Sequence, residues 1–234
     1  EKGAPVHKSY SRSQLLGFLL FISCSVEARS RDRLHEEQMV QGVPCIGTVE
    51  YRDNGTIHSC VLSKEHSIEG YLVPKTSHVF FGASGELDRI VVGDSSTIFD
   101  QSFPVGTSLF FNRWGHKISF WLPVSATIQG HRIRASDDGI GNGLYPNGKL
   151  QSIWLADDQD IDGIPCTSSA NLFRFGVKVL GFGARRMARF YANGRLQQAM
   201  MSRDIEIQGH SFSRGDIVSF GIDGTVDMTA KRLE

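Results

Sequence analysis

The chain of 234 residues has no excess of charge of either sign, because 25 Lys and Arg balance 25 Asp and Glu. Without a net positive field, it is not expected to bind nucleic acid or to adhere to an anionic membrane surface. Its four cysteines are too few for a disulfide-dense scaffold, and none forms a Cys-x-x-Cys pair for a thiolate zinc site. Its longest apolar run, 15–22, is shorter than the ~20 residues that span a bilayer.

In contrast to these features, glycine is abundant in the sequence. The chain contains 25 glycines, more than the ~7% of an average protein, and only seven prolines with no collagen-like period of three. Hydrophobic residues make up 40% of the sequence, enough for an ordinary buried core. The composition therefore predicts a globular chain with many tight turns.

The N-terminal segment has the pattern of an export signal. Three basic residues precede the apolar run 15–22, which is followed by the small residues 23–25, as in a secretory signal peptide. Cleavage could follow Val26-Glu27-Ala28, or Phe21-Ile22-Ser23-Cys24 could act as a bacterial lipobox that leaves a lipidated Cys24. The alternative is an ordinary buried amphipathic helix.

Export sets the expected organisation and location of the chain. We expect residues 1–28 to be the signal peptide and its flank, and the charged residues 29–38 to be a linker. The mature protein would be periplasmic, anchored to the outer membrane or extracellular in a bacterium, with a lipid anchor as its only membrane attachment.

An exported chain folds where disulfides form. Cys45, Cys60 and Cys166 remain after Cys24, so at most one disulfide can form within the chain. Cys45 and Cys60 are close enough in sequence to bridge neighbouring strands, but they could equally be small buried apolar residues. The sequence leaves both alternatives open.

An internal repeat of about 30 residues dominates the remainder of the chain. Its marker is a turn dipeptide ending in glycine, which recurs after 30, 30, 33, 46 and 30 residues: Asn54-Gly55, Ser84-Gly85, Trp114-Gly115, Asn147-Gly148, Asn193-Gly194 and Asp223-Gly224. An apolar residue, usually aromatic, stands four residues before each glycine: Tyr51, Phe81, Phe111, Leu144, Phe190 and Phe220. Isoleucine stands thirteen residues after the first five glycines: Ile68, Ile98, Ile128, Ile161 and Ile207.

The turn dipeptides predict the fold class. Asn-Gly and Asp-Gly suit both central positions of a type I′ turn, so each copy should be a two-residue β-hairpin. Because one repeat is too small to bury its own apolar face, neighbouring repeats must cover it. We predict an all-β antiparallel meander of about six hairpin repeats, forming an elongated twisted sheet or β-solenoid over 39–234 with an insertion at 167–188.

The repeat resembles the bacterial MORN-like proteins of the YwqK type. The resemblance rests on units such as Phe190-Tyr191-Ala192-Asn193-Gly194-Arg195-Leu196 with Ile207-Gln208-Gly209, and Leu144-Tyr145-Pro146-Asn147-Gly148-Lys149-Leu150 with Ile161-Asp162-Gly163. It implies a β-repeat surface used for binding or assembly and supplies no catalytic residues.

One segment has part of a calcium-binding pattern. Asp158, Asp160 and Asp162 open an Asp-x-Asp-x-Asp-Gly motif, whose carboxylates converge on one hard cation in calcium loops. The twelfth position is Ser169 instead of a bidentate Glu. The alternative is a solvated acidic turn without a cofactor.

Two further groups of residues are candidates for binding a partner. The insertion 167–188 carries Arg174, Lys178, Arg185 and Arg186, and is either a docking element for an anionic partner or an extra hairpin that caps the sheet. Trp121 and Trp154 occupy the same offset in successive repeats, so they should project from one face. They form an open apolar platform, or they belong to a core if a second layer covers them.

No sequence motif points to catalysis. The chain contains no Gly-x-Ser-x-Gly, no His-Glu-x-x-His and no P-loop. We therefore expect an exported, non-enzymatic repeat protein of the bacterial envelope that binds or scaffolds a protein or an envelope polysaccharide. The alternative is an envelope hydrolase acting on glycan, with its site near 167–188.

Overall fold

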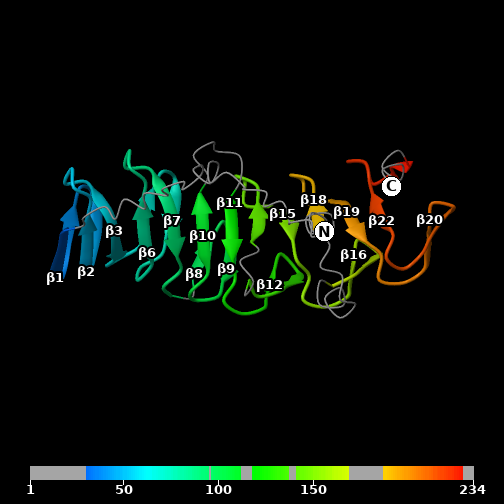
Figure 1. The fold of residues 1–234 in the computed structure, drawn as a ribbon, viewed down its shortest axis with the longest axis horizontal. Helices are drawn as coiled ribbons and strands as arrows, with labels where there is room; N and C mark the ends of the chain where they lie inside the picture. Colours follow the sequence, from blue (N-terminus) through cyan, green and yellow to red (C-terminus); the bar gives the residue numbers. More distant parts are fainter. Residues whose placement is uncertain (1–29, 95, 112–117, 137–140, 169–186, 229–234) are drawn as a thin grey trace, which may run out of the picture.

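The computed structural model describes residues 30–94, 96–111, 118–136, 141–168 and 187–228, which form an elongated row of β-strands (Figure 1). No α-helix occurs in these ranges. Accordingly, the described residues hold no helix with the length and hydropathy needed to cross a membrane.

Within the described residues, twelve strands form one antiparallel sheet and ten short strands form five separate hairpins. The sheet contains, in spatial order, β1 (Ser30–Val40), β2 (Val43–Tyr51), β3 (Ile57–Leu62), β6 (His78–Phe81), β7 (Leu87–Val91), β10 (Ser108–Phe111), β11 (Ile118–Trp121), β14 (Asn142–Leu144), β15 (Leu150–Ile153), β18 (Ala188–Phe190), β19 (Leu196–Met200) and β22 (Ile217–Ser219). The hairpins are β4 (His66–Ile68) with β5 (Tyr71–Val73), β8 (Ser96–Ile98) with β9 (Gln101–Phe103), β12 (Ala126–Ile128) with β13 (His131–Ile133), β16 (Gln159–Ile161) with β17 (Ile164–Cys166), and β20 (Ile205–Ile207) with β21 (His210–Phe212).

Each of the first five repeats thus contributes one hairpin to the sheet and one short hairpin beside it, and the sixth contributes β22. The strands of the sheet follow one another in chain order, with the short hairpins between successive long hairpins, and β1 and β22 are its two ends. The prediction of an all-β antiparallel meander in an elongated sheet is confirmed.

The tips of the long hairpins differ in detail from the predicted turn. Gly55, Gly85, Gly148, Gly194 and Gly224 have the expected positive φ, between 78° and 89°. The residue before each is not in the left-handed region, so these turns are not type I′. At the first tip the Gly55 N–H donates to the Arg52 carbonyl at 2.8 Å, and the pairing with β2 shifts by one residue near Tyr51. This is a type I turn followed by a glycine bulge, which Asn54 stabilises because its side-chain oxygen accepts the Thr56 N–H at 3.0 Å.

The type I′ geometry occurs instead in the short hairpins. Both central residues have positive φ at Glu69-Gly70, with 50° and 83°, and at Gln129-Gly130, with 50° and 81°. Phe99-Asp100 adopts the same conformation without a glycine, at 55° and 56°. This turn therefore explains the glycine two residues after most of the repeated isoleucines, because glycine adopts positive φ without steric cost.

Except at Phe99 in the second repeat, the first residue of that turn hydrogen-bonds to the following long hairpin. The Gln129 side-chain amide donates to the Gly148 carbonyl at 2.7 Å, and its oxygen accepts the Leu150 N–H at 3.2 Å. The equivalent side chains that accept a backbone N–H of the following hairpin are Gln41 for Ile57, Glu69 for Leu87, Asp162 for Leu196 and Gln208 for Val226. We call this recurrent contact the inter-repeat clamp.

The predicted linker at 29–38 is wrong for residues 30–38. These residues belong to β1, which pairs with β2 from Val40 opposite Val43 to Ser30 opposite Tyr51. Most β1 side chains are exposed, because β1 is the edge of the sheet. Charged side chains on an edge strand discourage pairing with another chain, and this makes the strand look like a linker in sequence. The predicted signal peptide at 1–28 and the lipidation site Cys24 lie outside the described residues.

A single hydrophobic core lies between the inner face of the sheet and the short hairpins. The five repeated isoleucines are all buried in this cluster, together with the inward-facing residues of the sheet strands such as Leu62, Ile90 and Phe120. Short hairpins contribute buried residues to the same cluster, for example Val73 and Ile133. Neighbouring repeats therefore share one continuous core, as expected for stacked units.

The two cysteine alternatives are resolved in favour of a disulfide. Cys45 in β2 and Cys60 in β3 are bonded, with their Cα atoms 5.9 Å apart. Cys166 is a buried free thiol. The disulfide joins the second and third strands of the sheet.

Truncation of the central isoleucine tests the shared core. Ile128→Ala should lower the free energy of unfolding by about 2 to 5 kcal/mol, since it leaves a cavity where neighbouring repeats meet. Thr127→Ala, at the adjacent exposed position, is the control and should change stability by less than about 0.5 kcal/mol. Urea unfolding measures both, and equal midpoints for the two variants would contradict a shared core.

Removal of one clamp tests the link between repeats. Gln129→Leu keeps a side chain of similar size but loses both hydrogen bonds, so the part-buried Leu150 N–H should exchange with solvent faster than in the wild type. Gln129→Glu keeps the acceptor, as Glu69 does naturally, and should retain most of the protection. Amide hydrogen exchange by NMR is the measurement. Unchanged protection of Leu150 in Gln129→Leu would show that the clamp does not restrain the next repeat.

Candidate functional site: the outer face of the sheet

The sheet has one face covered by the short hairpins and one outer face. Cross-strand pairing aligns Ser59, Phe80, Arg89, Phe110 and Ser119 in one row over β3, β6, β7, β10 and β11. A parallel row contains Val61, His78, Val91, Ser108 and Trp121. Residues directly opposite one another on a face contact through their side chains, so the register decides which groups meet.

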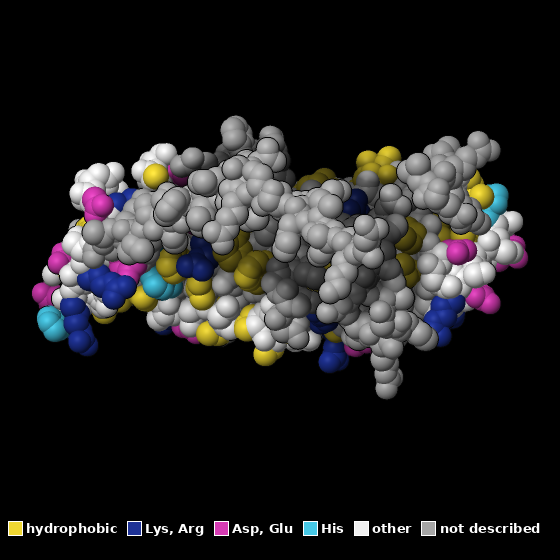
Figure 2. Space-filling view, in the orientation of Figure 1, with side chains coloured by type: hydrophobic (Ala, Val, Ile, Leu, Met, Phe, Trp, Pro, Cys, Tyr) yellow, Lys and Arg dark blue, Asp and Glu magenta, His cyan; other side chains and the backbone are white. Residues whose placement is uncertain are grey.

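Aromatic rings and one guanidinium group stack along this face. The Arg89 guanidinium carbon lies 3.8 Å from the centre of the Phe80 ring and 5.7 Å from that of Phe110. The Phe110 ring in turn lies 5.0 Å from the Trp121 indole. We call Phe80, Arg89, Phe110 and Trp121 the aromatic–arginine strip. Figure 2 shows hydrophobic, histidine and basic side chains gathered on the face over β6 to β10.

Arg89 is not neutralised by the described part of the protein. No ion pair or hydrogen bond from its side chain to a described residue is present, whereas Arg31 binds Glu50 at 2.8 Å and Arg132 binds Asp157 at 3.3 Å. A guanidinium stacked on an aromatic ring keeps its N–H groups at the ring's edge, where they can donate to a bidentate anion. Arg89 is thus packed against aromatic rings, and its side chain has no hydrogen-bond partner among the described residues.

Two histidines adjoin the strip. The His78 ring lies 4.2 Å from the Phe80 ring, and the His58 ring meets Phe80 edge-on at 6.2 Å. Burial lowers the pKa of His78 below its usual 6.5, and the positive charge of Arg89 and the nearby His58 lower it further, against the opposing effect of Glu50. His78 is therefore neutral at pH 7 and leaves Arg89 as the fixed cation of the strip.

The two tryptophans singled out in the sequence have different environments. Trp121 is 40% exposed beside Phe110, whereas Trp154 is 8% exposed. Gly141 makes room for the Trp121 indole, because any side chain at that position would overlap it. The Trp154 backbone N–H donates to the Asn142 side chain at 2.9 Å. Of the two, only Trp121 offers an open ring.

The three aspartates of the calcium-like motif do not converge. Asp158 accepts the Ser168 N–H at 2.6 Å, Asp160 pairs with Arg203 at 3.3 Å, and Asp162 accepts the Leu196 N–H in a clamp at 3.3 Å. In the described ranges, no three or more His, Cys, Asp or Glu side chains are grouped so as to hold a metal ion. The turn and the clamp account for the motif.

The basic candidates of the insertion, Arg174, Lys178, Arg185 and Arg186, lie outside the described residues. Among the described residues, the groups with shifted pKa near the core belong to separate repeats. Burial lowers the pKa of His131 and raises the pKa of the Cys166 thiol to about 12. A thiol with so high a pKa is protonated at neutral pH and is a poor nucleophile.

Sequence reasoning missed Phe80, Arg89 and Phe110. A usable signal existed in the doublets Phe80-Phe81 and Phe110-Phe111, because adjacent residues of a strand point to opposite faces. Phe81 is buried, as the repeat predicts, so its neighbour must face outward. The position of Arg89 between the two rings follows only from the cross-strand register.

The pKa of His78 provides a test of the strip's geometry. It should lie below 6.5 in the folded state, and Arg89→Met should raise it, while Arg203→Met in a distant repeat should not. The unfolded chain binds a proton at His78 more readily than the folded protein does. The contribution of His78 to the free energy of unfolding is therefore fully present above about pH 6.5 and is lost as the pH falls toward the lowered pKa. NMR titration of the His78 ring measures the shift. A His78 pKa unaffected by Arg89→Met would contradict the stacked arrangement.

Comparison with known proteins adds no relative: no family model matches the chain, and neither curated proteins nor solved structures contain a significant match.

Proposed function

We propose that this chain is a non-enzymatic binding protein of the bacterial envelope, and that the aromatic–arginine strip binds a polysaccharide carrying carboxylate groups. The proposal rests chiefly on Arg89, a guanidinium stacked between two phenylalanine rings with no carboxylate partner among the described residues. A cation held in that way is ready to pair with an anion of a ligand.

The spacing of the strip suits a chain of sugar units. Arg89 on β7 and Trp121 on β11 are separated by β10, so they lie about two strand spacings, or about 10 Å, apart. That distance is similar to the length of two sugar residues. The exposed Trp121 ring can stack against the apolar face of one sugar while Arg89 pairs with a carboxylate two units away.

The rigidity of the site also favours binding. Its side chains project from neighbouring strands of a hydrogen-bonded sheet and pack on one another. Little conformational entropy is therefore lost when a ligand docks. The Cys45–Cys60 disulfide further supports export to an oxidising compartment, in line with the N-terminal signal pattern.

A glycan hydrolase would need a different arrangement. Glycosidases use two carboxyl groups placed about 5 to 9.5 Å apart across the scissile bond. The strip itself contains an arginine and three aromatic residues and no carboxylate. This difference favours binding over hydrolysis as the function of the strip.

Titration with matched oligosaccharides tests the proposal. Tetragalacturonate, which is carboxylated, should bind more tightly than the uncharged cellotetraose in isothermal titration calorimetry, and added salt should weaken the binding of tetragalacturonate alone. Trp121→Ala should weaken both ligands at least tenfold, because it removes the stacking surface. Arg89→Met should abolish the preference for tetragalacturonate and leave cellotetraose binding unchanged.

Leu72→Ala provides a matched control, because Leu72 is 53% exposed but lies on a short hairpin away from the strip. It should bind both oligosaccharides as the wild type does. If Trp121→Ala and Arg89→Met also bind as the wild type does, the strip is not the binding site. Failure of both oligosaccharides to bind the wild type would contradict a polysaccharide ligand and direct attention to a protein partner.

A further inference from the structure

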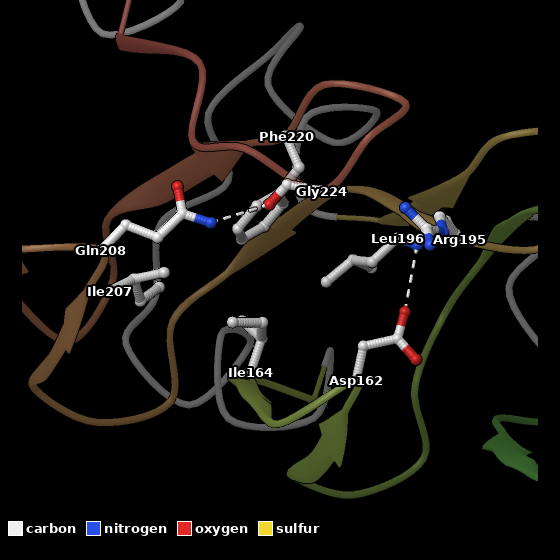
Figure 3. A pocket seen from close by; sticks show the side chains of 8 residues that line it. All are labelled: Asp162, Ile164, Arg195, Leu196, Ile207, Gln208, Phe220 and Gly224. Carbon is white, nitrogen blue, oxygen red and sulfur yellow. Dashed lines mark hydrogen bonds between the residues drawn. The ribbon is translucent and has the colours of Figure 1, made fainter.

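A pocket of about 390 Å³ lies near the C-terminal end of the repeat array, away from the strip. Its lining comes from three successive repeats, namely from the short hairpins β16–β17 and β20–β21 and from the tips of the following long hairpins (Figure 3). The lining residues are Asp162, Ile164, Arg195, Leu196, Ile207, Gln208, Phe220 and Gly224.

Apolar side chains of Ile164, Leu196, Ile207 and Phe220 form much of the pocket wall, and Asp162, Arg195 and Gln208 add polar groups to it. Leu196, Ile207 and Phe220 are otherwise buried core residues, and Ile164 faces them from β17. The polar lining groups already serve the fold: the Gln208 amide donates to the Gly224 carbonyl at 3.0 Å, and Asp162 accepts the Leu196 N–H. An apolar ligand therefore gains more from this pocket than a highly polar one.

The equivalent spaces of two earlier repeats hold an aromatic ring of the chain itself. The position directly after the type I′ turn glycine is Tyr71 in the first repeat, and its ring lies 4.9 Å from Phe111 and 5.4 Å from Phe99. In the third repeat the same position is His131, whose ring lies 5.1 Å from Phe190. In both cases the ring packs on the aromatic residue that stands four positions before the turn glycine, two repeats further along the chain.

The fourth repeat lacks that ring. Ile164 follows Gly163 as Tyr71 follows Gly70, and Phe220 stands where Phe111 and Phe190 stand. Because isoleucine is smaller and not planar, the space in front of Phe220 remains open. The pocket is thus the place of a ring that the first and third repeats supply from their own sequence.

We propose that this pocket binds a planar aromatic ligand of one or two rings, which occupies the position taken by Tyr71 and His131 in the other repeats. A ring in that position would meet Phe220 in the tilted arrangement seen between Tyr71 and Phe111. The volume lies within the range of small-molecule sites. The ligand is either a free aromatic compound or an aromatic side chain of a partner.

Small aromatic probes test the proposal with the wild-type protein. p-Cresol and indole should bind, as measured by ligand-observed NMR, and should shift the methyl signals of Ile164, Leu196 and Ile207. 4-Methylcyclohexanol, which has the size of p-cresol but no aromatic ring, should bind at least tenfold more weakly. N-acetyl-tyrosinamide distinguishes the sources: its binding supports a partner's side chain, and binding of p-cresol alone supports a free compound.

Two matched variants test the pocket: one fills it with a side chain, and the other opens an equivalent space in the third repeat. Ile164→Tyr should raise the Tm and abolish p-cresol binding, because the new ring takes the ligand's place. His131→Ala should open a second such space and bind 4-methylimidazole, which the wild-type third repeat should not. Arg89→Met should leave p-cresol binding unchanged, so failure of the strip and failure of the pocket are distinguishable.

Several results would overturn the proposal. These are equal binding of p-cresol and 4-methylcyclohexanol, methyl shifts outside the pocket, or p-cresol binding by Ile164→Tyr at wild-type strength. If Ile164→Tyr does not fold, the methyl shifts of the wild type and the response of His131→Ala still decide the question.

Discussion

Burial of apolar surface between neighbouring repeats is the interaction on which the rest of this structure depends. A unit of about 30 residues made of one long and one short hairpin cannot enclose a core of its own. Here Ile128 and its equivalents lie in one cluster that extends along the array. The inter-repeat clamp makes this packing directional, because a side-chain oxygen at the tip of one short hairpin accepts a backbone N–H of the next long hairpin. The clamp therefore sets how far each repeat is displaced from its neighbour.

The same packing determines where ligands can bind. The inner face of the sheet packs against the core, so we place the proposed binding strip on the outer face, where the pairing of neighbouring strands aligns the side chains. Function then depends on departures from the repeat. Arg89 is charged where the equivalent residues Ser59 and Ser119 are small and polar, and Ile164 lacks the ring found at Tyr71 and His131. Both proposed sites lie at such departures.

Asp162 shows how a motif in a repeat protein can mislead. Its place in an Asp-x-Asp-x-Asp-Gly pattern suggests a calcium ligand, but it has positive φ in a type I′ turn and accepts a backbone N–H across the repeat boundary. Asp tolerates the left-handed conformation, and its side chain reaches the Leu196 N–H, so two structural requirements explain a residue with a side-chain oxygen acceptor there. The other two aspartates point to separate partners.

Local chemistry made several features of this protein predictable from its sequence. The glycines with positive φ, the buried isoleucines and the alternation of buried and outward residues follow from turn geometry and from the pleat of a strand. The tertiary structure decided what depends on register and on neighbours: the type of each turn, the assignment of the charged residues of β1 to an edge strand, and the different exposure of Trp121 and Trp154. The stacking of Arg89 between Phe80 and Phe110 belongs to the same group. These features depend on contacts between strands whose residues lie about 10 to 30 positions apart in the sequence. The residue pattern within one strand does not specify such contacts.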